Sequence, residues 1–276
     1  MENQNQTVIR FGDEEYRELV LYMAQKYGID LSKKKILAEC RLDAELRRWN
    51  LSSLRGYLKL LREDKSGRME RELLNRLTTN YTYFCREKKH FEYLEKEILP
   101  SVPSAPGSPP YQIWCAGCST GEECYTLAMV LTEYRKRGGK LPPWKITGTD
   151  VSERSLKKAE EARYPMREIE RLPELWQDAY CMVEPEGDYF KVRPELCRDI
   201  RFVRKNLLDS VFEPEQYDLI FCRNVMIYFD EDARRRLLSN LYYALKPGGY
   251  LFLGHTELLP RNHDLFHYIC PAVYQR

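Results

Sequence analysis

The first third of the chain has the hydrophobic spacing of amphipathic helices. Apolar residues recur every three or four positions, which places them along one face of a helix. Breakers that include Gly28, Asn50 and Gly67 separate the periodic stretches. The pattern predicts four helices, at Phe11–Tyr27, Leu31–Trp49, Ser53–Arg62 and Met69–Thr79. We therefore expect a small α-helical N-terminal domain over residues 1–79.

The pattern changes after a connecting segment at residues 80–110. This segment begins with the aromatic-rich stretch Asn80–Phe91 and ends in the linker Ser101–Pro110, which is rich in proline and carries no charge. From residue 111 to residue 276, short apolar runs alternate with helical stretches, as in an α/β domain with a doubly wound sheet. The core strands are expected near Gln112–Cys115, Trp144–Thr149, Ile200–Arg204, Tyr217–Cys222 and Tyr250–Gly254, with a terminal hairpin after them.

One stretch, at about residues 164–198, interrupts this alternation. It contains four prolines and Gly187, and the run Asp188–Arg193 has the composition of a strand. We expect a small inserted subdomain here, with a helix and an antiparallel patch of two or three strands.

The loop after the first core strand suggests a nucleotide site. Gly117 and Gly121 stand between the strand and a helical pattern, an arrangement that lets the backbone approach a ligand closely. No lysine follows Gly121, and Glu122 and Glu123 would repel a phosphate. The two carboxylates suit a ligand with hydroxyls and positive charge, such as S-adenosyl-L-methionine (SAM). Taken alone, the loop is equally compatible with an ordinary tight turn.

Asp150 ends the second core strand, about 30 positions beyond the glycine loop. An acidic residue in this place can accept hydrogen bonds from both hydroxyls of a ribose. It can equally cap the helix that follows, although Ser152 is also available as a cap. Both interpretations remain open at this point.

Polar residues also follow the later core strands. Arg223 and Asn224 come directly after Tyr217–Cys222, where open α/β sheets bind their ligands. His255 lies at the end of the fifth strand, and none of the four histidines pairs with an acidic residue at metal-ligand spacing. A structural histidine is therefore favoured over a ligand, and no metal site is predicted.

Composition narrows the class of protein. The 276 residues carry a formal net charge of only +2, which argues against a nucleic-acid binder. No apolar run approaches the roughly 20 residues that span a bilayer, so we expect no membrane insertion. The polar start and nine cysteines favour reduced thiols and a cytoplasmic location.

The second predicted helix carries an excess of positive charge. Residues 33–59 contain eight Lys or Arg and three Asp or Glu. A solvated helix face explains such a run, and so does a docking surface for an acidic partner. The candidate docking residues are Lys33, Lys34, Lys35, Arg41, Arg47 and Arg48.

Several motifs in order carry a family resemblance. NYTYFCRE, AGCSTGEE, TGTDVS, CRNVMIYF and GHTE, spread over nearly the whole chain, resemble the chemotaxis receptor methyltransferase (CheR) family. Cys85, Cys115 and Cys124 stand where that family commonly has other residues. The resemblance implies a SAM-dependent protein-glutamate O-methyltransferase, acting as a monomer on chemotaxis receptors and releasing S-adenosyl-L-homocysteine.

The resemblance also implies roles for individual residues. The implied SAM contacts, together with Gly117 of the glycine loop, are Asn80, Thr82, Arg86, Glu123, Asp150, Asn206, Leu207, Arg223 and Asn224. A glutamate acceptor is already ionised at neutral pH, so no general base is required. Arg86 can orient that carboxylate by charge-assisted hydrogen bonds, and Tyr228 can add a phenol donor, which makes these two the candidate catalytic residues.

Three alternatives remain at the level of sequence. The acceptor could be an RNA or a small molecule, or the chain could be a SAM-binding adaptor without activity.

Family members that bind a C-terminal receptor pentapeptide carry a glycine-rich hairpin in the insert. The corresponding run Tyr180–Val192 has only Gly187, with Pro185 nearby. We therefore predict no dependence on a pentapeptide.

Overall fold

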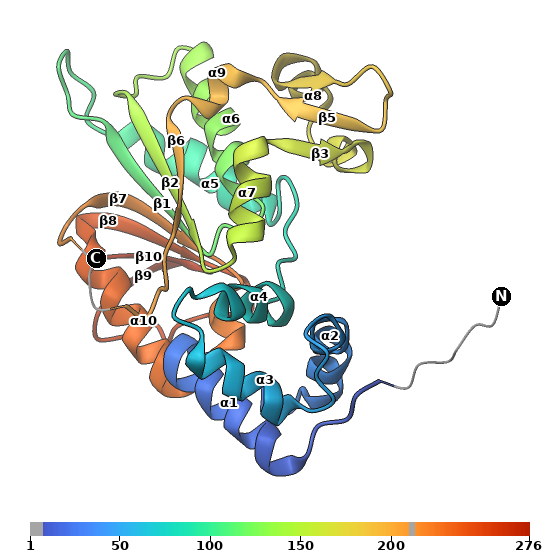
Figure 1. Ribbon diagram of the computed structural model, residues 1–276. Helices are drawn as coiled ribbons and strands as arrows, with labels where there is room; N and C mark the ends of the chain where they lie inside the picture. The colour runs from blue at the N-terminus through green and yellow to red at the C-terminus, as the bar shows by residue number, and fades with distance from the viewer. Residues whose placement is uncertain (1–7, 210–212) are drawn as a thin grey trace. The chain divides into compact units, whose positions relative to one another are not determined.

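The computed structural model describes residues 8–209 and 213–276 (Figure 1). Backbone contacts divide these residues into two compact units. One, the helical unit, holds the described residues up to Thr79 together with Tyr228–Arg236. The other, the sheet unit, holds Asn80–Ile227 and Leu237–Arg276.

The helical unit contains the four predicted helices. They are α1 (Asp13–Tyr27), α2 (Lys35–Arg48), α3 (Leu54–Glu63) and α4 (Arg68–Leu77). Their periodic apolar residues form its core, and Leu19, Leu42 and Leu73 are fully buried. Gly28 ends α1 in a left-handed conformation, with φ +67°, that closes the helix as a C-terminal cap. The all-helical N-terminal part is therefore confirmed.

A later segment of the chain packs with these helices. Ile29 and Phe229 form an isolated antiparallel bridge. On either side of it, the Asp30 N–H donates to the Tyr228 carbonyl at 2.8 Å and the Asp230 N–H to the Gly28 carbonyl at 3.3 Å. The turn after α1 thus holds a segment that lies almost 200 residues further along the chain. No local pattern in the sequence predicts this pairing.

The sheet unit is built on seven strands in the order β6-β2-β1-β7-β8-β10-β9. The first five of these run parallel, and β10 and β9 complete the sheet as an antiparallel hairpin. The chain direction across the sheet reverses between β1 and β7, and ligands of doubly wound sheets bind beyond the carboxyl ends at such a point. The strands are β1 (Tyr111–Ala116), β2 (Trp144–Asp150), β6 (Ile200–Arg204), β7 (Tyr217–Cys222), β8 (Leu245–Leu253), β9 (His267–Cys270) and β10 (Val273–Gln275).

One strand is longer than predicted. β8 begins at Leu245, which pairs with Tyr217, and the register shifts before Tyr250 pairs with Leu219. Gly248, at φ +76°, lies in the irregular part. The sequence Lys246–Gly249, with one proline and two glycines, is typical of a turn between helix and strand. It is instead an irregularity within the strand, because a glycine at positive φ can bend a strand without ending it.

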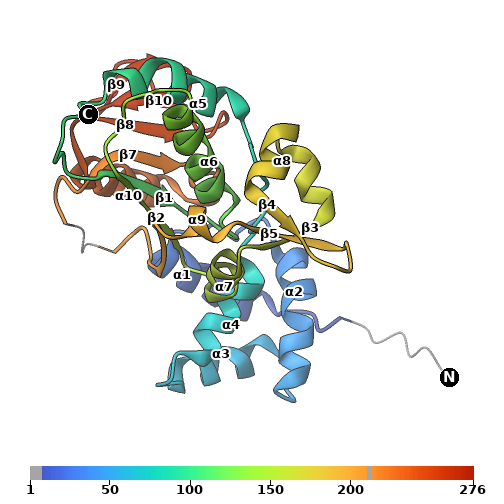
Figure 2. The same cartoon turned by 90° about the horizontal axis from the view of Figure 1, so that it is seen from above.

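Helices alternate with the strands along this part of the chain. They include α5 (Lys88–Tyr93), α6 (Glu122–Lys136), α7 (Glu153–Glu161) and α10 (Glu231–Ala244). Figure 2 shows α6 lying along the sheet. Most of the first three turns of α6 are buried, so this helix is a central element of the core.

The inserted subdomain has the predicted kind of structure. Its elements are β3 (Arg163–Pro165), the 3-10 helix η3 (Met166–Arg171), α8 (Glu174–Tyr180), β4 (Cys181–Val183), β5 (Tyr189–Val192) and α9 (Pro194–Cys197). The three strands form an antiparallel sheet in the order β3-β5-β4. The rings of Phe84, Tyr164 and Phe190 pack together, with centroids 4.9 to 5.9 Å apart, and join this sheet to the Asn80–Phe91 segment.

Among the described residues, no helix is long and apolar enough to cross a membrane.

Candidate active site

The glycine loop after β1 is tied to the neighbouring strand. The N–H groups of Gly117 and Cys118 both donate to the Thr149 carbonyl near the end of β2, at 2.8 and 2.9 Å. Gly117 has φ +81°, and a Cβ there would lie 2.5 Å from Cγ2 of Val225. A Cβ on Gly121, at φ +92°, would lie 2.8 Å from the Cβ of Ala159. Both glycines are therefore required by the path of the backbone.

Asp150 lies beside this loop with its carboxylate buried. One oxygen accepts the Ser119 N–H and the other the Ser152 N–H, both at 2.9 Å. Ser152 is the N-cap of α7, because its hydroxyl accepts the Ser155 N–H. Burial raises the pKa of Asp150, and the backbone N–H groups oppose that rise. The Val151 N–H also bonds to this carboxylate. A carboxylate has about four lone-pair sites, so Asp150 can still accept a hydroxyl group.

Asn80 is held next to the same loop. Its carbonyl accepts the Ser119 hydroxyl at 3.0 Å, and its side-chain amide donates to the Ser155 hydroxyl at 2.7 Å. Thr82, two residues further on, is half-buried. The connecting segment thus brings Asn80, one of the residues named by the resemblance, to the ends of β1 and β2.

Arg86 keeps most of its donors available. Its guanidinium lies 5.8 Å from the ring of Tyr81 and 5.7 Å from that of Tyr83, and it donates one hydrogen bond, at 2.8 Å, to the Tyr81 carbonyl. Within the described part of the chain this is its only side-chain hydrogen bond. A guanidinium has five N–H donors, so this group can still bind a carboxylate.

Arg223 differs from Arg86, because its guanidinium is buried and is engaged by protein groups through Nε and Nη1. The side chain is only 2% exposed. Nε donates to Glu123 at 2.7 Å, and Nη1 donates to the Arg86 carbonyl at 2.7 Å and lies 3.4 Å from Glu87. These contacts indicate that Arg223 holds Glu123 and the Arg86 backbone, and the SAM contact that the resemblance implies for Arg223 stays a prediction.

Asn224 combines an unusual backbone with an unpaired oxygen. Its φ of +59° is in the left-handed region. Its N–H donates to Glu257 at 2.5 Å, and its side-chain amide donates to Glu87 at 3.4 Å. Its side-chain Oδ1 is buried and has no hydrogen-bond partner among the described residues. A buried acceptor without a donor is costly, which indicates that a ligand supplies the donor.

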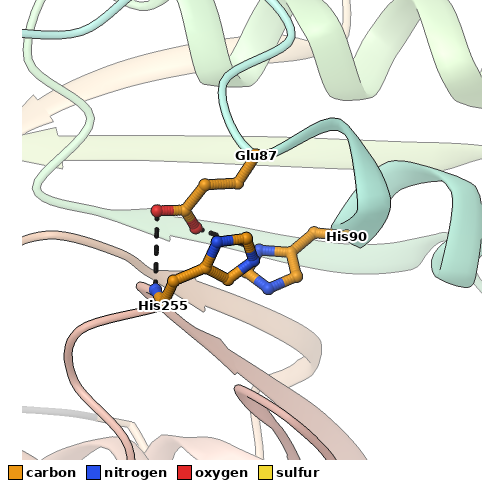
Figure 3. A group of neighbouring side chains, drawn as sticks. All are labelled: Glu87, His90 and His255. Carbon is orange, nitrogen blue, oxygen red and sulfur yellow. Dashed lines mark hydrogen bonds and ion pairs between the residues drawn. The ribbon is translucent and has the colours of Figure 1, made fainter.

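The fold brings Glu87, His90 and His255 together, although spacing along the sequence indicated no such group (Figure 3). Their potential ligand atoms lie within 4.8 Å of one another. Burial, Arg223 and His255 lower the pKa of His90 to about 3, so its ring is neutral.

The arrangement disfavours a metal at this cluster. Nδ1 of His90 lies 3.2 Å from Nη1 of Arg223, which can only donate. Nδ1 also lies 3.3 Å from Oε2 of Glu87, which accepts, so the tautomer of His90 depends on which of the two groups it bonds, and in either case Nδ1 is engaged by a protein group. Glu87 already faces the cation of Arg223. The cluster is better described as part of a buried charge network.

The turn after β6 is joined to the same edge. The Lys205 N–H donates to the Asp150 carbonyl at 3.1 Å, which places Asn206 and Leu207 just beyond it. Asn206 accepts the Leu208 N–H at 3.1 Å, and the Leu207 carbonyl accepts the Asn240 amide at 2.9 Å. These bonds fix the turn.

Tyr228 belongs to the helical unit. It ends the 3-10 helix η4 (Met226–Tyr228), and its ring lies 5.1 Å from Nζ of Lys34. Together with the Asp30 hydrogen bond to its carbonyl, this contact fixes the tyrosine from the side of α2.

Several candidate docking residues hold the helical unit together. Lys35 pairs with Asp13 at 2.6 Å, and Arg47 pairs with Asp43 at 2.8 Å. Arg41 donates to the carbonyls that end α4, those of Leu77 and Thr78. Arg48 lies 3.8 Å from Glu45. Lys33 is exposed, and no hydrogen bond or ion pair of its side chain appears among the described residues.

The strand ends can be tested against the chemistry of SAM. That molecule presents ribose hydroxyls, an α-ammonium group and a sulfonium, which are all donors or positive centres. The site offers matching acceptors in Asp150, in Glu123 and in the unpaired Oδ1 of Asn224, and Gly117 allows close backbone approach. The residues present therefore fit SAM.

Sequence reasoning missed Glu87, His90 and Glu257 as part of this site. Glu87 follows Arg86 in the NYTYFCRE motif, and Glu257 closes the GHTE motif at a strand end. Motif membership was the available signal. Their partners, however, lie on other strands and become apparent only in the folded chain.

The seven-stranded sheet with its polar carboxyl edge defines a SAM-dependent methyltransferase. Family models identify it further: "CheR methyltransferase, SAM binding domain" matches residues 80–274, and "CheR methyltransferase, all-alpha domain" matches residues 14–78. The chain belongs to the CheR methyltransferase family.

Two curated relatives are similar to the chain over most of its length. The chain is 37% identical to the chemotaxis protein methyltransferase of Borreliella burgdorferi, over 97% of this chain and 96% of that protein. It is 34% identical to the chemotaxis protein methyltransferase of Escherichia coli, over 90% and 86%. A solved SAM-dependent methyltransferase from Mesorhizobium loti aligns with 60% of this chain and 52% of that one, at 17% identity and a TM-score of 0.33.

Proposed function

We propose that the protein methylates glutamate side chains on chemotaxis receptors, forming γ-methyl esters, with SAM as donor and S-adenosyl-L-homocysteine as product. The observation that carries the proposal is the contrast between two arginines of one site. Arg223 is bound to protein groups through Nε and Nη1, whereas Arg86, whose backbone carbonyl Arg223 holds, keeps most of its donors available for an acceptor carboxylate.

The residues would divide the binding between them. SAM, when bound, supplies a methyl group on a positively charged sulfur. Asp150 would accept the ribose hydroxyls, and Asn224, with its unpaired Oδ1, would accept an ammonium N–H. Asn80, Thr82, Glu123 and the turn at Asn206 and Leu207 would complete the cofactor site.

Catalysis would then rest on orientation. The acceptor glutamate is ionised at neutral pH and needs no base to remove a proton. Arg86 would hold one carboxylate oxygen by charge-assisted hydrogen bonds and so direct the other toward the methyl group. Tyr228 would add a phenol donor, and water would be excluded from the reacting atoms.

The experiment is incubation of the protein with receptors and SAM labelled in its methyl group. The proposal predicts base-labile, volatile label on receptor protein. Arg86→Ala should reduce the rate roughly a hundredfold or more, with little change in unfolding free energy. Lys88→Ala, at an exposed neighbouring position, is the matched control.

The other outcomes separate the alternatives. Label on RNA or on a small molecule would identify a different acceptor. SAM binding without transfer to any receptor would identify an adaptor. An Arg86→Ala variant that retains a near-normal rate would remove Arg86 from the mechanism.

We also propose that the basic surface of α2 docks an acidic receptor segment. Lys33 is exposed and Lys34 is half-buried, and the exposed apolar side chain of Ile36 adjoins them. Lys33→Glu should raise the receptor KM and flatten its salt dependence while leaving SAM affinity unchanged. Arg41 is unsuitable for this test because it holds the end of α4. An unchanged KM would return the surface to an ordinary solvated helix face.

We further propose that activity does not depend on a receptor pentapeptide. The turn between β4 and β5 has a single glycine, Gly187 at φ +77°, and contains Pro185. β4 is nevertheless an edge strand with Met182 and Val183 exposed, so a peptide could reach it. Calorimetry with a synthetic receptor pentapeptide decides the question, and binding at micromolar affinity would refute the proposal.

We propose, finally, that the protein acts as a monomer in the cytoplasm.

A further inference from the structure

Glu257 collects backbone N–H groups from two segments of the chain. Its side chain lies after the end of β8, and the residue is only 6% exposed. Oε2 accepts the N–H groups of Asn224 at 2.5 Å and Gly254 at 2.9 Å, and Oε1 accepts that of Ile227 at 3.1 Å. The Met226 N–H also bonds to this carboxylate.

The charge of this carboxylate is compensated by backbone dipoles. Among the described residues no ion pair involves Glu257, so converging N–H groups serve as its counter-charge. The titratable groups that face it are the Cys222 thiol and, across the Asn224 amide, Glu87 with His90, Arg223 and His255. Burial raises the pKa of Glu257, and its four N–H donors act against that rise.

The geometry is made for this one side chain. A Cβ on Gly254 would lie 2.6 Å from Oε2 of Glu257 and 2.7 Å from the side-chain nitrogen of Asn224, so glycine is needed to let the two segments meet. Asn224 adopts a left-handed backbone conformation, which asparagine tolerates better than most residues other than glycine. The bond from its N–H to Glu257 holds the residue in this conformation.

We propose that Glu257 is a positioning residue for the cofactor site: its carboxylate fixes the segment from Asn224 to Ile227 and so aims the unpaired Oδ1 of Asn224 at the ligand. The inference rests on the proposed role of Asn224 in SAM binding. It assigns to Glu257 no contact with SAM or with the receptor.

The test is Glu257→Gln, which preserves shape but turns an NH₂ group toward N–H donors that need an acceptor. S-adenosyl-L-homocysteine is the probe, and calorimetry is the measurement. We expect its Kd to rise tenfold or more and the receptor KM to stay within twofold. Glu257→Asp, which keeps the charge, should recover part of the affinity, and Glu186→Gln, at an exposed position, should change nothing.

A second measurement uses the unaltered protein and remains available if the variant does not fold. The backbone amide protons of Asn224, Ile227 and Gly254 should show NMR shifts that change together as pH is lowered, with one midpoint. The affinity for S-adenosyl-L-homocysteine should fall around that same midpoint. Neither the amide shifts nor the S-adenosyl-L-homocysteine affinity requires the methyl-accepting substrate. Both measurements therefore remain valid tests of Glu257 if the substrate is not glutamate.

Two results would overturn the inference. One is a Glu257→Gln variant that is folded and binds the probe within twofold of the unaltered protein. The other is a set of amide protons that titrate separately, or an affinity that falls at a different pH from theirs. Either would show that the carboxylate supports the fold without positioning the site.

Discussion

The ends of β1 and β7 lie side by side in the sheet, yet their loops are held by different means. The loop Gly117–Gly121 after β1 is fixed by its own glycines and by hydrogen bonds to the adjacent strand. The segment Arg223–Ile227 after β7 is fixed by carboxylates that lie far away in the sequence, those of Glu87, Glu123 and Glu257.

The two loops should therefore respond differently to substitutions. A loop held by backbone conformation depends on the residues within it. A loop held by buried charges depends on partners elsewhere, and the loss of one partner leaves the others uncompensated. Substitutions at β7 should therefore cost more than substitutions at β1, and should do so through residues that do not contact SAM.

The largest effect is expected at Arg223. Arg223→Met leaves Glu87 and Glu123 buried without their shared cation, and breaking such a pair costs about 3–5 kcal/mol. Urea denaturation measures the loss of unfolding free energy. The control is Arg204→Met, because Arg204 is 37% exposed and its ion pair with Glu153 should contribute less than about 1 kcal/mol. Equal costs for the two variants would contradict the charge-held description of the β7 loop.

The next effect belongs to the β1 end, at Glu122. Burial raises the pKa of Glu122 to about 7, with Glu168 as a smaller cause. In the unfolded chain the same group titrates near pH 4. Between these two values the folded state binds the extra proton, so stability is greatest below the lower pKa and falls as pH rises toward the higher one.

The loss between pH 4 and pH 8 should reach about 3 kcal/mol for this one group. Glu122→Gln should remove that part of the slope and be relatively more stable at pH 8. Denaturant unfolding at a series of pH values measures this, with exposed Glu160→Gln as the control. An unchanged slope would mean that the carboxylate of Glu122 is better solvated than its burial indicates, and that the β1 loop is held by conformation alone.

The same contrast explains what the sequence could predict. Helix periodicity, short apolar strands and glycine signals act over a few residues, so the four helices, the core strands, the insert and the glycine loop were recognisable. Ser152 as the cap of α7 was also within reach, since a cap depends on neighbouring residues. The motif resemblance supplied the family and the candidate site residues.

What the sequence could not supply are relationships between distant segments. The pairing of Ile29 with Phe229 places Tyr228 with the helical unit, and no local signal announces it. The engagement of Arg223 by Glu87 and Glu123 likewise depends on chain topology. The sequence shows the excess positive charge of the run in α2. Only the folded chain shows that Lys35 and Arg47 have acidic partners, which reduce the free charge of this run.

The smallest predicted effect tests whether the two loops are independent. Gly117 and Val225 touch across the gap between β1 and β7, since a Cβ on Gly117 would lie 2.5 Å from Cγ2 of Val225. Gly117→Ala should cost about 2 kcal/mol, part from its positive φ and part from this clash. Val225→Ala should cost about 1 kcal/mol through lost packing.

The double variant separates these causes. Removing the Val225 branch relieves the clash but leaves the backbone cost, so the combined loss should be smaller than the sum of the two by about 1 kcal/mol. Urea unfolding of all four proteins gives the coupling energy. Additivity within about 0.5 kcal/mol would mean that the glycine is needed only for its backbone conformation and that the loops do not constrain each other. The predicted coupling would show that the locally held β1 loop also fixes the charge-held β7 loop, through one methyl group.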